Sequence, residues 1–181
     1  MRTIFRELLG TLILALIIFL ILQATIQSVI VIGPSMQPGL ESKQRLLLNK
    51  AVYYFHEPEK GDVIVFHPPL TPRSDYIKRI IASPGDTIEV KEGLVYVNGL
   101  ELHEPYIKAT PHYTLPEQGI PEDNYFVLGD NRNNSQDSHN DWMVKREAIK
   151  GKVWLSIWPP DKWGDVPDYS SLEQLASATS K

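Results

Sequence analysis

The segment best suited to chemistry is the serine-containing stretch VIGPSMQPGL, residues 31–40. Gly33 and Pro34 bend the chain immediately before Ser35, and a further proline follows closely. Most serines in such loops are turn residues, but a stiff, bent segment also suits a serine nucleophile. The G-x-S-x-G elbow of esterases is excluded, because Gln37 occupies the position that requires glycine.

A serine nucleophile needs a general base, and the strongest candidate is Lys78. None of the five histidines lies in a setting typical of histidine-dependent proteases. In the run DYIKRIIAS, strand alternation places Lys78 on the same face as Tyr76 and Ile80. Desolvation among apolar neighbours lowers a lysine pKa, in the extreme by up to ~5 units, and a neutral amine can accept the serine proton. The alternative is a lysine that extends from a sheet edge into solvent.

The densest polar cluster is GDNRNNSQDSHNDW, residues 129–142, which follows a run expected to be a buried strand. Polar groups beside a core need partners, because each unsatisfied one costs ~1–3 kcal/mol. An Asx-rich loop is one interpretation of this stretch. Metal binding through Asp130, Asp137 and Asp141 is less favoured, since the spacing is not that of an EF-hand. No metal or other cofactor is therefore expected.

Composition narrows the remaining classes of function. The net charge is −4 and the basic residues are scattered, which gives no indication of a nucleic-acid partner. Cysteine is absent, so a thiol nucleophile and a cysteine metal site are both excluded.

The elements that must position these residues begin with an apolar run from Leu8 to Ile32, which contains no charge. A helix of about 20 apolar residues spans a bilayer, so the run predicts a membrane anchor. Arg2 and Arg6 precede it, and the positive-inside rule then places the N-terminus in the cytoplasm and the rest of the chain on the extracytoplasmic side. A cleaved signal peptide is the alternative, but the run is long and no clean A-x-A site follows.

Beyond the anchor, short runs rich in Val, Ile, Tyr and Phe alternate with turn residues. This pattern predicts a single, mainly β domain with a hairpin at Asn98-Gly99. One or two helical turns are expected in VKREAIKGK, residues 144–152, and a short helix in SSLEQLA, residues 170–176. The expected organisation is a cytoplasmic N-terminus (residues 1–7), a transmembrane anchor (8–32), a β-rich protease domain (33–163) and a loosely held polar tail (164–181).

Three segments together resemble type I signal peptidase, a membrane-anchored serine protease family. They are PSMQP around Ser35, YIKRIIASPGD around Lys78, and GDNRNNSQDS, which begins at Gly129. KGDVIVF and GKVWLSIWP also resemble family segments, so the resemblance extends in order from the anchor to about residue 160. His139, which follows the DS pair, is more similar to the cyanobacterial and thylakoid enzymes than to enterobacterial ones.

The resemblance implies a Ser-Lys dyad, in which Ser35 is the nucleophile and Lys78 the general base. Ser135 would hydrogen-bond the lysine amine and orient it. Asp130 would pair with Arg79 and thereby brace the strand that carries the base.

The resemblance also implies supporting roles around the dyad. Gly129 and Asp137 would hold the polar loop in shape, and the Ser35 backbone N–H would contribute to the oxyanion hole. Gly33 stands where many members carry a serine whose hydroxyl contributes to the oxyanion hole. His139 stands where some members carry an arginine paired to the aspartate, and a histidine in that place would make the pair pH-sensitive. The residues expected to shape pockets for small substrate residues are Val31, Ile32, Met36, Leu40, Tyr76 and Ile77.

The function implied is removal of signal peptides from exported preproteins after small residues, at A-x-A type sites, by an enzyme anchored in the plasma or thylakoid membrane. The expected partners are therefore preproteins and the lipid bilayer. One alternative is a different Ser-Lys protease, such as a self-cleaving repressor, but that class is soluble and carries DNA-binding sequence. The other is a non-catalytic anchored β-domain scaffold, which would not need Ser35 and Lys78 together.

Overall fold

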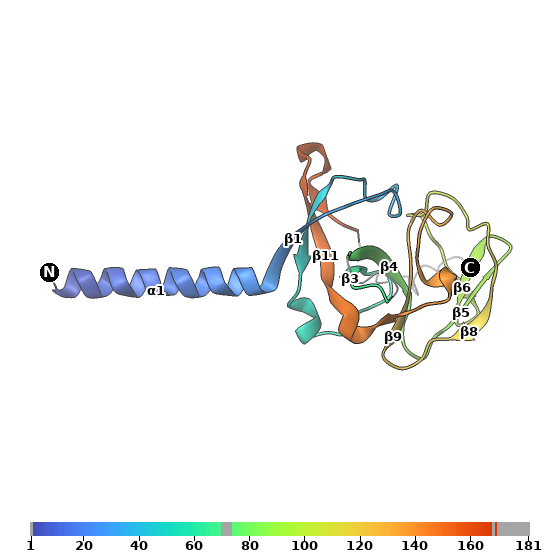
Figure 1. The fold of residues 1–181 in the computed structure, drawn as a ribbon, viewed down its shortest axis with the longest axis horizontal. Helices are drawn as coiled ribbons and strands as arrows, with labels where there is room; N and C mark the ends of the chain where they lie inside the picture. Colours follow the sequence, from blue (N-terminus) through green and yellow to red (C-terminus); the bar gives the residue numbers. More distant parts are fainter. Residues whose placement is uncertain (1, 70–73, 168, 170–181) are drawn as a thin grey trace, which may run out of the picture.

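The structure is a computed structural model that describes residues 2–69, 74–167 and 169. A long N-terminal helix projects from a body made of β-strands and a few short 3₁₀ turns (Figure 1). The prediction of a mainly β fold behind one N-terminal helix is confirmed. The short helix expected over residues 170–176 lies outside the described residues.

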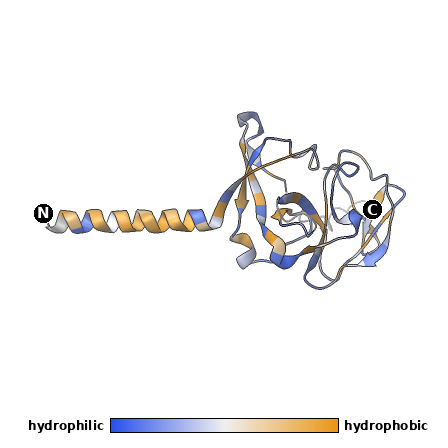
Figure 2. Cartoon of the chain, in the orientation of Figure 1, coloured by the Kyte–Doolittle hydropathy of each residue, from blue (hydrophilic) through white to orange (hydrophobic). Residues whose placement is uncertain are grey.

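The helix α1, Arg2–Thr25, is apolar along nearly its whole length (Figure 2). Its described side chains are exposed, including Phe5 and Phe19. Within the described part of the chain, one helical segment, Ile4–Thr25, is long and apolar enough to cross a membrane. In the described residues its apolar side chains are not buried, and contacts such as that of the Thr25 carbonyl with Lys50 lie at its C-terminal end, as a lipid-embedded anchor requires.

The helix does not coincide with residues 8–32, the limits predicted for the anchor. The helix begins at Arg2 and ends at Thr25, and Ile26–Ile30 form strand β1. Strand β1 pairs antiparallel with β2, Arg45–Asn49, which supplies hydrogen-bond partners for its backbone. The β-branched Ile and Val residues of β1 favour a strand once such a partner is present.

Strand β4, Tyr76–Ala82, lies inside an eight-stranded sheet of order β1-β2-β11-β3-β4-β9-β10, in which β12 also pairs with β11. Ile64 pairs with Lys78 on one side of β4, and Leu128 pairs with Arg79 on the other. The last five residues of β4 are buried. The remaining strands of this sheet are β3 Val63–Phe66, β9 Asn124–Leu128, β10 Val144–Lys145, β11 Ile149–Trp158 and β12 Gly164–Asp165.

A smaller sheet of order β7-β6-β5-β8 lies at the end of the body opposite α1 (Figure 1). Its strands are β5 Thr87–Lys91, β6 Leu94–Val97, β7 Leu100–Glu101 and β8 Leu115–Gly119. The hairpin predicted at Asn98-Gly99 is confirmed: it joins β6 to β7, and both residues have positive φ, 53° and 74°. One apolar cluster, which includes Ile81, Ile88 and Leu128, packs the two sheets together.

Two local predictions agree only in part with the structure. Only one 3₁₀ turn, η3 Arg146–Ala148, forms in residues 144–152, and Gly151 lies within β11, where a Cβ would collide with the backbone of Asn49. The expected loose tail is ordered at its start, because Gly164 and Asp165 form β12 and Val166 is buried. The other 3₁₀ turns are η1 Val52–Tyr54, η2 Ser138–Asn140 and η4 Pro160–Lys162.

Candidate active site

The loop that carries Ser35 joins β1 to β2 and stands on buried apolar side chains. Val31, Met36 and Leu40 are at most 3% exposed and pack into the core of the larger sheet. The Leu40 N–H donates to the Met36 carbonyl at 2.9 Å and closes a turn after the serine. Ser35 is half-buried, so its hydroxyl lies on a rigid turn at the edge of the core.

Gly33 has a φ of +86°, a conformation that L-residues with side chains rarely adopt. A Cβ added at this position would have no heavy atom within 4 Å, so backbone conformation rather than crowding accounts for the glycine. With no side chain at position 33, this residue offers no hydroxyl to an oxyanion, and the backbone N–H of Ser35 stays the donor predicted from the sequence.

Lys78 is brought directly to Ser35. Its Nζ lies 2.8 Å from Ser35 Oγ, although the two residues are 43 positions apart in the chain. Lys78 is only 4% exposed, which contradicts the alternative of a lysine extended into solvent. The ring of Tyr76 lies beside the amine, 5.3 Å from Nζ to the ring centroid.

The surroundings of Lys78 favour the neutral amine. Burial lowers the pKa of Lys78 to about 8, while the negative charges of Asp137 and Asp130 act in the opposite direction. A general base is most effective when its pKa lies near the working pH. The site therefore has the properties needed to deprotonate a serine hydroxyl near neutral pH.

The polar loop after β9 hydrogen-bonds the backbone carbonyl groups of Pro34 and Ser35. The Asn131 backbone N–H donates to the Ser35 carbonyl at 3.0 Å, and its side-chain amide donates to the Pro34 carbonyl at 3.1 Å. At Gly129, a Cβ would collide with Ser135 Oγ and with the Ser35 carbonyl oxygen, so glycine permits the close approach. Asn131 was not predicted, although its place directly after Asp130 in the polar cluster was a usable signal.

The expected hydrogen bond between Ser135 and Lys78 is not formed. Ser135 Oγ is buried and has no hydrogen-bond partner among the described residues. The amine instead contacts Ser35, and the Ser135 side chain packs into the space beside Gly129. Ser135 and Lys78 nevertheless line the same cleft, so the hydroxyl is close to the dyad without being bonded to it.

Arg79 and Asp130 form a buried ion pair behind the dyad. Arg79 Nε and Nη2 donate to the two carboxylate oxygens at 3.0 and 2.8 Å, and the side chains are 3% and 1% exposed. Arg79 Nη1 also donates to the Gly61 carbonyl at 2.8 Å, and the guanidinium lies over the ring of Tyr106. Because Arg79 follows Lys78 on β4, this pair fixes the strand beside the base.

Asp137 connects the polar loop to β9 and to the histidine that lines the cleft. One carboxylate oxygen accepts from the Gly129 N–H at 2.9 Å, and the other lies 2.6 Å from His139 Nδ1. Asp137 is fully buried, and the ring of Tyr113 stacks on that of His139 at 4.2 Å. The contact between Asp137 and His139 corresponds to the aspartate pair considered from the sequence.

A second buried ion pair, Arg132 with Glu104, was not predicted. Two guanidinium nitrogens of Arg132 donate to the two oxygens of Glu104 at 2.6 Å each. The pair joins the polar loop to the segment between β7 and β8 of the smaller sheet. The 28 positions between the two residues left no local sequence signal for it.

An open cleft of about 480 Å³ lies over Ser35 and Lys78. Of the six residues expected to shape substrate pockets, Ile32 and Tyr76 line it. Val31, Met36 and Leu40 do not, because they point into the core beneath the loop, and Ile77 packs against that core. The remaining lining residues are Gly33, Pro34, Asn133, Asn134, Ser135, Gln136, His139 and Asn140.

Comparisons with known proteins show the family of this chain. The family described as signal peptidase, peptidase S26, matches residues 4–158. The chain is 42% identical to a probable signal peptidase I-1 of Synechocystis sp., over 75% of this chain and 73% of that protein. It is 40% identical to signal peptidase I of Bacillus caldolyticus, over 72% and 78%. It is 36% identical to thylakoidal processing peptidase 1 of Arabidopsis thaliana, over 73% and 42%. The chain therefore belongs to the signal peptidase family, peptidase S26.

Proposed function

We propose that this protein is a membrane-anchored serine endopeptidase that removes signal peptides from preproteins, with Ser35 as nucleophile and Lys78 as general base. The observation that carries the proposal is the 2.8 Å contact between Ser35 Oγ and the amine of a lysine that is 4% exposed. Family membership supports the reaction class, and the geometry of the dyad supports the assignment of roles.

The proposed reaction proceeds in two halves. The neutral amine of Lys78 accepts the hydroxyl proton of Ser35 while Oγ attacks the scissile carbonyl, and the Ser35 backbone N–H stabilises the developing oxyanion. The Lys78 ammonium then donates its proton to the departing amine of the mature protein. A water molecule, deprotonated by the same amine, cleaves the acyl-enzyme and releases the signal peptide from Ser35.

The lowered lysine pKa makes this chemistry feasible near neutral pH. With a pKa of about 8, roughly a tenth of the Lys78 amines are neutral at pH 7. An ordinary lysine with a pKa near 10.4 would be neutral in fewer than ~0.1% of molecules. The buried setting thus raises the population of the active base by about two orders of magnitude.

The proposed specificity is for small residues before the cleaved bond. The cleft wall includes Tyr76 and the exposed side chain of Ile32. In the proposal these two bulky side chains lie against the substrate residues before the cleaved bond and exclude larger ones through steric clash, as A-x-A type sites require.

The proposed topology places the N-terminus in the cytoplasm and the catalytic body on the extracytoplasmic side. Arg6 near the start of α1 supports this orientation through the positive-inside rule. The segment between Thr25 and Ser35 is short, which limits how far the dyad can lie from the end of the helix. Because signal peptides are also held in the bilayer, confinement of enzyme and substrate to one surface raises their effective concentration.

The test is cleavage of a model preprotein with an A-x-A site by the full chain in phospholipid vesicles, with sequencing of the product N-terminus. Ser35→Ala should reduce the rate by roughly 10⁴-fold or more, since the nucleophile is lost. Ser42→Ala is the matched control, because Ser42 is exposed on the same loop and should leave the rate unchanged. Full activity of Ser35→Ala would overturn the assignment of Ser35 as nucleophile, and no cleavage by the unsubstituted chain would favour the scaffold alternative.

A further inference from the structure

The C-terminal strap, defined as residues 164–167 and 169, runs from the larger sheet toward the back of the dyad. Gly164 and Asp165 pair with β11 as β12. The Val166 N–H then donates to the Trp154 carbonyl at 2.9 Å. These backbone bonds hold the start of the strap against a ten-residue strand of the sheet.

The strap contacts the base of the nucleophile loop. Val166 is 9% exposed and belongs to the same apolar cluster as Val31, Met36 and Leu40. These three residues are the buried support of the turn that carries Ser35. The strap is therefore part of the packing that fixes the position of the nucleophile.

The strap also contacts the residue next to the base. The Pro167 carbonyl accepts a hydrogen bond from Arg79 Nη1 at 3.1 Å, and the Tyr169 ring lies 5.0 Å from the Arg79 guanidinium carbon. The Tyr106 ring lies 4.3 Å from the same carbon, and the two tyrosine rings are 4.8 Å apart. Arg79 thus lies against two aromatic rings that also contact each other, a setting that stabilises a guanidinium. None of these three side chains lines the cleft.

We propose that the strap is a positioning element for catalysis, in which Tyr169 and Pro167 hold Arg79 on Asp130 and so keep the Lys78 side of β4 fixed and dry. The inference rests on the proposed function, because it assigns the strap a role through the Ser35–Lys78 dyad. It names Tyr169 as a positioning residue that does not contact the substrate cleft.

The physical link runs through charge and water. Two carboxylates, Asp130 and Asp137, favour the ammonium form of Lys78, and Arg79 neutralises the first of them. If the Tyr169 ring is removed, Arg79 is held less firmly on Asp130 and water can enter beside it. A less compensated Asp130 and a wetter amine both favour protonated Lys78, so both raise the pKa of Lys78.

Other groups near the dyad limit how the effect can be interpreted. Tyr76 lies beside Lys78 on β4, and His139 lines the cleft from the polar loop and is paired with Asp137. In the described residues, the ring and cation contacts of Tyr169 are with Tyr106 and Arg79, and not with Tyr76, His139 or Asp137. A substitution at position 169 should therefore act through Arg79 and Asp130.

The experiment compares kcat/KM from pH 6 to 10 for the full chain and for Tyr169→Ala, with a model preprotein in vesicles. The acid limb, in which kcat/KM falls as Lys78 is protonated, should move to higher pH in Tyr169→Ala. Its kcat/KM should therefore be lower on the order of 5-fold at pH 7 and should match that of the unsubstituted chain at pH 10. Tyr169→Phe keeps the ring over Arg79 and should restore the original limb. A purely structural loss would lower activity equally at every pH.

Three results separate the possible outcomes. If the acid limb of Tyr169→Ala superimposes on that of the unsubstituted chain, the strap proposal is overturned. If Lys78→Ala is inactive in the same assay, the dyad assignment still stands. Activity in Lys78→Ala would instead overturn the proposed function. If Tyr169→Ala does not fold, Tyr169→Leu keeps the apolar bulk, and it should shift the limb in the same direction by a smaller amount.

Discussion

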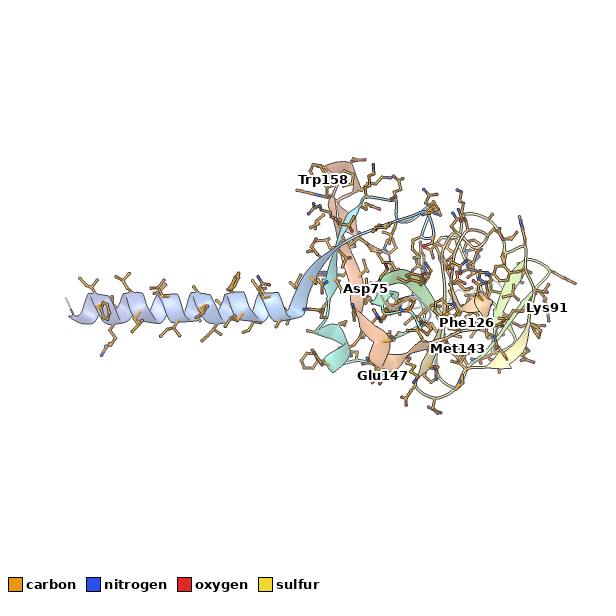
Figure 3. The ribbon with its side chains drawn as sticks, viewed as in Figure 1. Asp75, Lys91, Phe126, Met143, Glu147 and Trp158 are labelled. Atoms are coloured by element: carbon orange, nitrogen blue, oxygen red, sulfur yellow. The ribbon has the colours of Figure 1, made fainter. Side chains whose placement is uncertain are left out.

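Two lysines in this molecule lie beside tyrosine rings and behave in opposite ways. Lys78 is on the buried strand β4, 5.3 Å from the Tyr76 ring, and Lys91 is at the end of β5, 4.7 Å from the Tyr96 ring. Figure 3 shows Lys91 at the end of the body farthest from α1. The pKa of Lys78 is lowered to about 8 by burial, whereas the pKa of Lys91 is raised, chiefly by its hydrogen bond to Glu89.

The difference shows that a tyrosine neighbour does not make a lysine a base. Lys91 has a carboxylate at 2.8 Å and a side chain that is 51% exposed, so its ammonium form is both solvated and paired. Lys78 has a serine hydroxyl at the same distance and almost no solvent. Removal of water, together with a neutral rather than a charged partner, separates the catalytic lysine from the surface one.

The largest expected difference is between the variants in which one or the other lysine is removed. Lys78→Ala should lower kcat by about 10³-fold, within the range that a general base contributes. Lys91→Ala should leave kcat unchanged, because Lys91 is remote from the cleft. Rates of preprotein cleavage by the two variants provide the measurement, and equal rates would show that burial does not distinguish the two lysines functionally.

A smaller effect is expected from the ion pairs that accompany the two lysines. Asp130→Asn leaves the Arg79 charge buried without its partner and should reduce the free energy of unfolding by about 3 kcal/mol. Glu89→Gln, at the exposed pair with Lys91, should produce no resolvable change, because water solvates both groups. Urea denaturation in detergent measures both, and a comparable loss in the two variants would contradict the contrast between buried and exposed pairs.

For each unit of pH the expected effect is smaller, because it is graded. The base is neutral above a pKa of about 8 and protonated below it, so kcat/KM should fall roughly tenfold per pH unit on the acid side. Lys91→Ala should leave this limb in place, since Lys91 does not share the environment of the dyad. A profile that stays flat down to about pH 5 would mean that Lys78 is not the base.

Local patterns in the sequence were sufficient for several features. The alternation around Lys78 indicated a strand, Asn98-Gly99 indicated a hairpin, and the apolar run indicated a long N-terminal helix; all three are present. These features depend on side-chain periodicity and turn chemistry over a few residues. They can therefore be inferred before any long-range contact is known.

Other features required contacts that no local pattern contains. The helix ends at Thr25 because the residues after it find a strand partner in β2. Asn131 holds the Ser35 carbonyl, and Ser135 packs beside Gly129 without bonding Lys78, because the polar loop folds back onto the nucleophile turn. The strap is ordered because Arg79, far from it in the sequence, offers a donor and a planar cation.

The sequence by itself determined which groups are available: a serine on a bent turn, a lysine on an apolar strand and an apolar helix before them. Only the tertiary structure decided that the serine and the lysine meet, that the lysine is dry and that an ion pair and a strap lie behind it. The physical reason is that hydrogen-bond geometry and desolvation depend on distances between residues remote in the chain. Periodicity reports only which face of its own element a side chain occupies.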